Sequence, residues 1–224
     1  MDMPRRTIGE WAQISCDLVL LNVLWLVCCL PVVTIGASTA AMHSVARKMA
    51  ACEHYTVWSG FWHGFRENWK QGTAVTVILG VVLLISWADF TIGLNNPGLT
   101  GIACQAVGVL GMIMGVFTLT LAFPVLTRYR LPLRTVLKNA VLLSLANPHV
   151  VLVGLAAAAL FPALIVWNID LLVIAVPGWV LLGGGLPVLA EQLLMRKVYA
   201  RLEAGQITEE SNHGDSETET HPHP

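Results

Sequence analysis

The distribution of basic residues is the feature that most constrains how this chain can fold. All 13 Lys and Arg residues fall in four clusters, and long apolar stretches separate the clusters. Basic side chains that flank membrane-crossing segments stay preferentially on the cytoplasmic side. If every cluster is cytoplasmic, the chain crosses the membrane an even number of times between neighbouring clusters. The clusters are Arg5/Arg6, Arg47/Lys48/Arg66/Lys70, Arg128/Arg130/Arg134/Lys138 and Arg196/Lys197/Arg201.

The composition agrees with a membrane protein. Apolar residues make up 55% of the chain and charged residues only 12%, whereas a soluble domain carries roughly 25% charge. We therefore expect an all-α, polytopic transmembrane bundle over residues 1–203, with both termini inside. Residues 204–224 contain few large apolar side chains and no Lys or Arg, which predicts a disordered, acidic cytoplasmic tail.

About six membrane helices in three hairpins account for the apolar stretches, because an apolar helix needs about 20 residues to cross a bilayer. Two amphipathic helices on the cytoplasmic side are expected to connect the hairpins. The expected membrane helices cover residues 9–30, 37–52, 73–94, 100–126, 149–168 and 171–200, and the amphipathic helices cover 56–70 and 132–146.

The chain must turn back soon after its first helix if the second basic cluster is to stay inside. Pro31 lacks an N–H and disfavours helix in the residue before it, so the first helix should end near Leu30. Thr34 and Gly36 then supply a turn. The helix over 37–52 is rich in Ala and Ser, so we expect other helices to surround it. The alternative is a re-entrant half-helix.

The hairpin makes a checkable prediction for Asp17. If the chain turns back here, Asp17 should lie at the same depth in the membrane as about residue 50. A carboxylate below the membrane surface is costly unless it is paired. Arg47 and Lys48 are its expected partners. The alternative is a hydrated Asp17 near the interface.

The segment 56–70 is predicted to be an amphipathic helix in the cytoplasmic headgroup layer. Aromatic side chains recur at helical spacing on one face, and basic and polar side chains take the other. The sharper hypothesis is a helix that docks on a partner protein, and the alternative is a simple interfacial connector. The candidate partner-binding residues are Trp58, Phe61, Trp62, Phe65, Arg66, Trp69 and Lys70.

The sequence contains no phosphate-cradling glycine loop, nucleophile elbow or zinc-binding helix motif. We therefore expect no catalytic residues, no metal, no cofactor and no nucleic-acid partner. Asp89, in the outer third of 73–94, is a candidate for a transport role because intramembrane acids are costly. Gly111, Gly115 and the run 183–185 fit either a broken helix that lines a cavity or close packing of helices.

Two motifs resemble the signature of the YesL family of bacterial membrane proteins. The first is LPVVTIGA over residues 30–37, followed by AAM over 40–42, and the second is FWHGFRENWKQ over 61–71. Asn22 and Trp25 also fit the first helix of the family, whereas the link over residues 50–55 departs from its pattern. The resemblance covers about residues 10–75. It implies a domain of unknown function, whose genes often neighbour sugar-uptake transporters and glycan-degrading enzymes.

Three functions remain open from the sequence. The leading hypothesis is a non-enzymatic accessory protein of carbohydrate uptake in the bacterial cytoplasmic membrane, which contacts the membrane subunits of a sugar transporter and the lipid bilayer. The second is a small transporter or channel that uses the Gly/Pro-rich helices and Asp89. The third is a structural membrane protein. The sequence does not determine the sugar, the partner or the oligomeric state.

Overall fold

The computed structural model describes residues 8–129, 131–196 and 198–200, and within them every regular element is helical. The all-α prediction is confirmed for these residues. Arg5, Arg6, Arg130, Lys197, Arg201 and the predicted tail over 204–224 lie outside the described residues. The elements are α1 (Ile8–Cys29), η1 (Val32–Thr34), α2 (Ile35–Ala51), α3 (Val57–Asn95), α4 (Leu99–Arg128), α5 (Leu133–Ala146), α6 (Pro148–Trp167), η2 (Ile169–Leu171) and α7 (Leu172–Leu182). A further helical segment runs over Gly185–Ala200.

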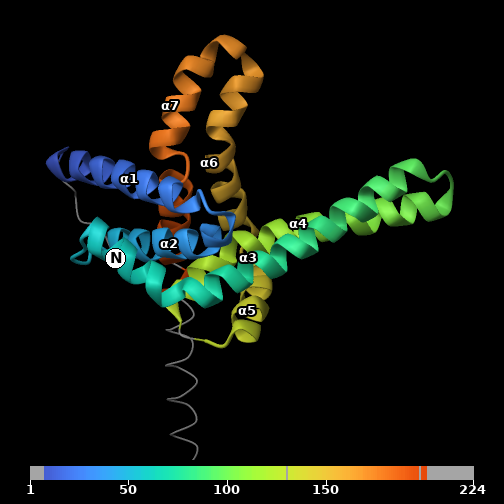
Figure 1. Ribbon diagram of the computed structural model, residues 1–224, viewed down its shortest axis with the longest axis horizontal. Helices are drawn as coiled ribbons and strands as arrows, with labels where there is room; N and C mark the ends of the chain where they lie inside the picture. Colours follow the sequence, from blue (N-terminus) through green and yellow to red (C-terminus); the bar gives the residue numbers. More distant parts are fainter. Residues whose placement is uncertain (1–7, 130, 197, 201–224) are drawn as a thin grey trace, which may run out of the picture.

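The chain doubles back between α1 and α2, as Figure 1 shows. Pro31 has extended backbone angles (φ −77°, ψ 118°), so α1 cannot continue through it. The Thr34 hydroxyl donates hydrogen bonds to the carbonyl oxygens of Cys28 and Pro31, the latter at 2.6 Å. The bond to Cys28 satisfies a carbonyl group in the last turn of α1, and the Pro31 carbonyl also accepts from the Thr34 backbone N–H at 2.9 Å. The turn thus contains Pro31 and Thr34 in the roles expected from the sequence.

Gly36 has a different role from a turn residue, because it lies inside α2 and is buried against α3. A Cβ on Gly72 of α3 would lie 2.7 Å from the Gly36 carbonyl oxygen. The two backbones therefore meet at a glycine pair, where any side chain would separate the helices.

One continuous helix, α3, replaces the predicted amphipathic helix over 56–70 and membrane helix over 73–94. The predicted division is wrong because nothing between residues 70 and 73 stops a helix. Gly72 is the only weak helix former there, and its contact with Gly36 stabilises it in place. Gln71 anchors the same region, since its side-chain amide donates to the Leu131 carbonyl oxygen at 3.3 Å.

Helices α3 and α4 form a long hairpin that projects from the body (Figure 1). Gly98 (φ +96°) forms the tight turn at its tip. Along the hairpin, a Cβ on Gly108 would lie 2.6 Å from the Phe90 backbone nitrogen. Small residues therefore let the two backbones approach closely, in the manner of membrane helix pairs.

A second hairpin, formed by α6 and α7, projects in another direction (Figure 1). The predicted single helix over 171–200 is wrong, because η2 precedes α7 and the chain bends by 52° between α7 and the segment Gly185–Ala200. Gly183 and Gly184 form the break. A sharper bend, 92°, separates α5 from α6 just before Pro148.

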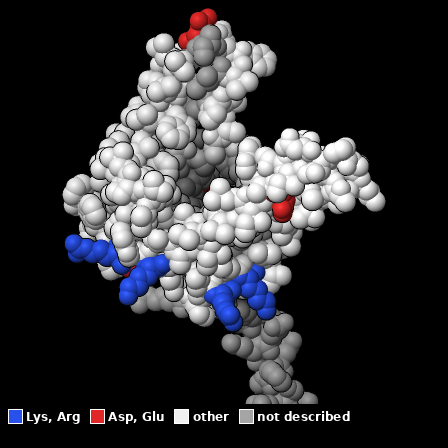
Figure 2. Space-filling model, turned by 45° about the vertical axis from the view of Figure 1, so that its right-hand side comes forward, with Lys and Arg blue, Asp and Glu red and all other residues white. Residues whose placement is uncertain are grey.

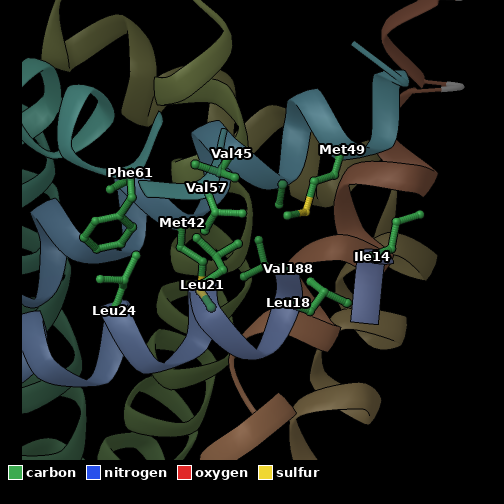
Figure 3. Packing of buried hydrophobic residues seen from close by; sticks show 12 residues of the cluster. Ile14, Leu18, Leu21, Leu24, Met42, Val45, Met49, Val57, Phe61 and Val188 are labelled. Carbon is green, nitrogen blue, oxygen red and sulfur yellow. The ribbon is translucent and has the colours of Figure 1, made fainter. Parts of the chain in front are cut away.

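The largest core cluster joins α1, α2, the first turns of α3 and the segment after α7. Figure 3 shows these side chains converging between the helices. Two further clusters pack α4 against α3 and α5, and against α6 and the C-terminal segment. The core cluster contains Ile14, Leu18, Leu21, Leu24, Ala41, Met42, Val45, Ala46, Met49, Val57, Phe61 and Val188.

Three described helices are long and apolar enough to cross a membrane, namely α1, α3 and α4. The count rises to five if α5 with α6, and α7 with the segment Gly185–Ala200, each form one bent span. Helix α2, with 17 residues, is not among these spans, so the expected six-helix layout stays a prediction.

The distribution of the charged side chains agrees with a membrane surface at one end of the molecule. Figure 2 shows Lys and Arg side chains gathered along one end of the visible face, while the most prominent acidic side chains lie away from that end. This segregation is what the positive-inside rule expects of a cytoplasmic face.

Candidate functional site

The aromatic residues predicted to bind a partner lie on the first turns of α3, close to the basic end of the molecule. Their rings contact one another in sequence order. The ring centroids of Trp58 and Trp62 are 6.2 Å apart, those of Trp62 and Phe65 are 5.7 Å apart, and those of Phe65 and Trp69 are 5.2 Å apart. These distances fall in the range of stabilising aromatic pairs.

Phe61 is a core residue and cannot contact a partner. Its side chain is fully buried beside Leu24 in the largest core cluster (Figure 3). Phe65 also packs against this cluster while remaining partly exposed. The spacing of the aromatic residues does not separate inner from outer positions, because only the packing of α1 and α2 against α3 decides which side is covered.

Four of the predicted residues present exposed side chains. Trp58 is 58% exposed and Trp69 is 40% exposed, and Arg66 and Lys70 are exposed as well. Exposed indole rings beside basic groups suit either a headgroup layer or a protein partner. We call these four residues the α3 docking face.

A groove adjoins the α3 docking face. It has a volume of about 820 Å³ and is lined by residues 65–71 of α3, by Leu126 of α4, and by Leu131 and Pro132 of the loop before α5. The exposed rings therefore border a concave surface with both apolar and polar groups, which is the kind of surface that receives another side chain or helix.

Asp17 has a different partner from the one expected. The Tyr55 hydroxyl donates a hydrogen bond to Asp17 Oδ2 at 2.8 Å. Within the described residues, no salt bridge joins Asp17 to Arg47 or Lys48. The reason lies in the link after α2, where Cys52 adopts a left-handed conformation (φ 57°, ψ 29°). That turn brings Tyr55 next to α1.

Asn22 is a structural determinant whose partner the sequence does not indicate. Its side chain is fully buried and lies against the break after α7. Asn22 Nδ2 donates to the Val180 carbonyl oxygen at 2.7 Å, and Gly184 N–H donates to Asn22 Oδ1 at 3.0 Å. A helix would join Val180 and Gly184 directly, so the Asn22 amide replaces one helical hydrogen bond.

Trp25 lies one turn further along α1 and ties α1 to α2. Its indole N–H donates to the Thr39 hydroxyl at 3.2 Å. Its six-membered ring also borders Gly184, where an added Cβ would lie 3.2 Å from Trp25 Cε3. The first helix therefore supplies both residues that hold the bent segment in place.

Glu191 is the buried acid that the sequence interpretation missed. It is only 6% exposed, and it has no hydrogen bond or ion pair within the part of the chain that the structure describes. A Cβ on Gly154 of α6 would lie 2.8 Å from Glu191 Cγ, so a glycine makes room for it. The sequence signal that could have identified Glu191 is the presence of an acidic residue in the apolar stretch before Arg196.

Buried polar groups continue next to Glu191. Gln192 Nε2 lies 3.2 Å from His43 Nδ1 in a buried hydrogen bond. The His43 ring stacks on Phe123 with centroids 5.8 Å apart. This contact links α2, α4 and the C-terminal segment, so the hydrogen bond also has a structural role. Among the described residues, no group of three His, Cys, Asp or Glu side chains could hold a metal ion.

The glycine-rich segments proposed as a cavity lining are closely packed. An added Cβ on Gly115 would lie 2.7 Å from Leu83 Cδ2, and one on Gly184 would lie 2.6 Å from Asn22 Oδ1. Asp89 is partly exposed and has no ion pair within the described residues. The structure therefore does not bring Asp89 and these glycines together around a cavity.

Comparison with known proteins places these features in a family. The family model described as "Protein of unknown function, DUF624" matches residues 18–90. "Uncharacterized protein YesL" from Bacillus subtilis (strain 168) is 27% identical over 158 residues, which cover 68% of this chain and 73% of that protein. The chain is therefore similar to this YesL-like family, most clearly over residues 18–90. No solved structure matches.

The region that matches the family model corresponds to the N-terminal helices of the structure. Residues 18–90 run from the second half of α1 to most of α3. They include Asn22, the turn at Pro31 and the α3 docking face, whereas Glu191 lies outside them. The family is uncharacterised, and its description indicates no enzymatic activity.

Proposed function

We propose that this protein is a non-enzymatic accessory factor of carbohydrate uptake in the bacterial cytoplasmic membrane. Its partner would be a membrane subunit of a sugar transporter, bound through the α3 docking face. The membrane character is supported by three long apolar helices. The connection with carbohydrate comes from the family resemblance, because genes of YesL-like proteins often neighbour sugar-uptake genes.

The single observation that carries the docking proposal is the exposure of Trp58 and Trp69 on an otherwise anchored helix. Phe61 is buried in the core on the same turns of α3, so the helix forms a firm support. Exposed tryptophans on a firm support lose little conformational freedom on binding, which favours them as interface anchors. Arg66 and Lys70 add charge that can select an acidic partner loop.

The position of the docking face agrees with a cytoplasmic contact. The face lies at the end of the molecule where the Lys and Arg side chains gather in Figure 2. A multi-pass arrangement with both termini inside is part of this proposal. Membrane subunits of transporters also expose loops at the cytoplasmic surface. A contact between the two proteins there requires no further membrane crossing by either chain.

Site-specific photo-crosslinking in cells tests the proposal. A photoreactive amino acid at position 58 or 69 should capture a membrane subunit of a sugar transporter. The matched control is position 84, because Leu84 is 68% exposed but lies far along the α3/α4 hairpin. Capture of the transporter only from 58 and 69 supports the proposal. Capture of lipid alone at all three positions contradicts it and favours the structural alternative.

A transport function is the second candidate, and the buried Glu191 is the observation that favours it. A buried carboxyl group in a membrane helix is a default functional site, and Glu191 has no partner among the residues that the structure describes. Proton flux into proteoliposomes under a pH gradient would test it. Flux that is lost in Glu191→Gln but kept in Asp89→Asn would support transport, and the absence of flux in the unmodified protein would contradict it. The close packing at Gly115 and Gly184 favours the accessory function.

A further inference from the structure

A second concave site lies on the basic end of the molecule, separate from the α3 docking face. It is a pocket of about 270 Å³ between the end of α2, the start of α3 and the end of α4. We propose that this pocket binds a phosphate group, carried either by a phospholipid headgroup or by a soluble ion. We call it the α2–α4 pocket. The lining residues that matter here are Arg47, Lys48, Thr56, Gly60, Glu67 and Arg128.

The charges around the α2–α4 pocket favour an anion. Arg47, Lys48 and Arg128 line it, and Glu67 is the one carboxylate among the lining residues. Glu67 Oε2 lies 3.6 Å from His63 Nε2 of the same helix, and both residues line the pocket. Within the described residues, no carboxylate forms an ion pair with Arg47 or Lys48. Positive charge therefore exceeds negative charge in a small space, and an anion would balance it.

Arg47 provides an observation that points to a missing acceptor. Its Nε is buried and has no hydrogen-bond partner among the described residues. An unpaired buried donor is costly, and the cost is larger for a charged group. Phosphate oxygens accept hydrogen bonds from a guanidinium group in pairs, with both geometric fit and charge complementarity. Arg47 lines the pocket, so its guanidinium group is positioned to interact with a phosphate there.

Arg128 is held in position by aromatic rings. Its guanidinium carbon lies 4.3 Å from the centroid of Tyr199 and 5.8 Å from that of Tyr129. Cation–π contacts of this length restrict the side chain and hold its positive charge at the pocket. The pocket therefore contains a preorganised cation as well as the more flexible Lys48.

The backbone adds a further contribution. The α3 helix begins at Val57, and its N-cap residue Thr56 makes no side-chain capping bond. Thr56 and Gly60 both line the pocket, so the N-terminal end of α3 borders it. Helix N-termini favour anions. Lys48 and Arg128 lie in the last turns of α2 and α4, so part of their charge offsets the carbonyl groups there.

The size and place of the pocket limit the ligand. A volume of about 270 Å³ accommodates a phosphate group with a few attached atoms, and excludes a nucleotide with its base and sugar. Basic pockets at the cytoplasmic ends of membrane helices bind lipid headgroups. Inorganic phosphate offers the same oxygens without an acyl chain, so the two sources are distinguished by experiment.

The test uses the full-length protein in detergent and compares two double variants. Arg47→Gln/Lys48→Gln removes two cations from the pocket. Arg134→Gln/Lys138→Gln removes two exposed cations from α5, outside the pocket. Native mass spectrometry measures retention of added phosphatidylglycerol against phosphatidylcholine. Thermal stabilisation by inorganic phosphate is measured against chloride at equal ionic strength.

The expected result is that the pocket variant loses affinity for one of the two probes by about tenfold or more, which corresponds to one lost charge-assisted hydrogen bond. The control variant should match the unmodified protein. Loss confined to phosphatidylglycerol assigns the lipid source, and loss confined to inorganic phosphate assigns the soluble source. Equal losses in both double variants, or no binding of either probe, would overturn the proposal. If the double variant does not fold, Lys48→Gln alone is compared with Lys138→Gln.

Discussion

The Asn22 contact offers a sharp test of how the bent C-terminal region is stabilised. Asn22→Ala removes the amide that replaces the helical hydrogen bond between Val180 and Gly184. The Val180 carbonyl and the Gly184 N–H, now bound at 2.7 and 3.0 Å, would both lose their partner. Asn22 is fully buried, so the protein around it does not let water replace the amide.

The magnitude follows from these two bonds. A buried polar group left without a partner costs about 1–3 kcal/mol. Side-chain hydrogen bonds between membrane helices average a smaller value, about 0.6 kcal/mol, because the reference state also finds partners. For two groups we therefore expect Asn22→Ala to lower the free energy of unfolding by about 2–4 kcal/mol. That is a large fraction of the total stability of a typical protein, which is about 5–15 kcal/mol.

Unfolding in mixed detergent micelles, followed by tryptophan fluorescence, measures this loss. The matched control is Asn95→Ala, because Asn95 also donates a side-chain bond, at 2.8 Å to the Thr91 carbonyl, but lies exposed near the tip of the α3/α4 hairpin. The control should change stability by no more than about 0.5 kcal/mol. Equal effects of the two substitutions would refute the role assigned to Asn22.

A double-mutant cycle sharpens the same test. A Cβ on Gly184 would lie 2.6 Å from Asn22 Oδ1, so Gly184→Ala should also destabilise the protein. If the collision with Asn22 is the cause, Gly184→Ala should cost clearly less in the Asn22→Ala background. Strict additivity would show that the glycine is needed for another reason, such as its contact with Trp25.

Three other predictions concern the helices and the topology. Phe61→Ala should lower the free energy of unfolding by about 3–5 kcal/mol because it empties a core position. Trp58→Ala should change the same quantity by no more than about 0.5 kcal/mol. Similar losses for the two variants in chemical denaturation would contradict the assignment of Phe61 to the core. Gly108→Ala should destabilise the α3/α4 hairpin because its Cβ would meet the facing backbone, and Gly80→Ala, with nothing within 4 Å, should stabilise the helix by about 0.5–1 kcal/mol; thermal melts that show the opposite order would refute this packing. A cysteine at position 63, where the side chain is 76% exposed, should react with an impermeant maleimide only after the cells are permeabilised, and reaction in intact cells would place the docking face outside.

The positions of the helices could largely be expected from local chemistry, while the site could be expected only in part. The turn at Pro31 and Thr34 follows from residue type, since proline ends a helix whatever surrounds it. The aromatic residues of α3 were also visible as a set. Their division into a buried Phe61 and an exposed Trp58 was not, because it depends on which side of α3 is covered by distant segments.

Each of the two main incorrect expectations has an identifiable physical cause. The predicted break near residue 71 assumed that a change from polar to apolar composition would end a helix, but only proline, glycine in a suitable conformation or a cap does so. The predicted ion pair of Asp17 assumed that the nearest cations in register would reach it, but the left-handed residue Cys52 places Tyr55 there instead. The first error concerns local helix-stop signals, whereas the second comes from a contact between segments far apart in sequence.

The sequence by itself determined the class of this protein and the turns of its chain. Apolar stretches of bilayer length and segregated basic clusters leave a helical membrane protein as the solution, because a lipid environment requires internally satisfied backbone hydrogen bonds. Only the tertiary structure decided the partners of its polar groups: Asn22 with the break after α7, Glu191 against Gly154, and Arg47 at the α2–α4 pocket. These pairings depend on how helices far apart in the chain cross one another, and no local residue pattern contains that geometry.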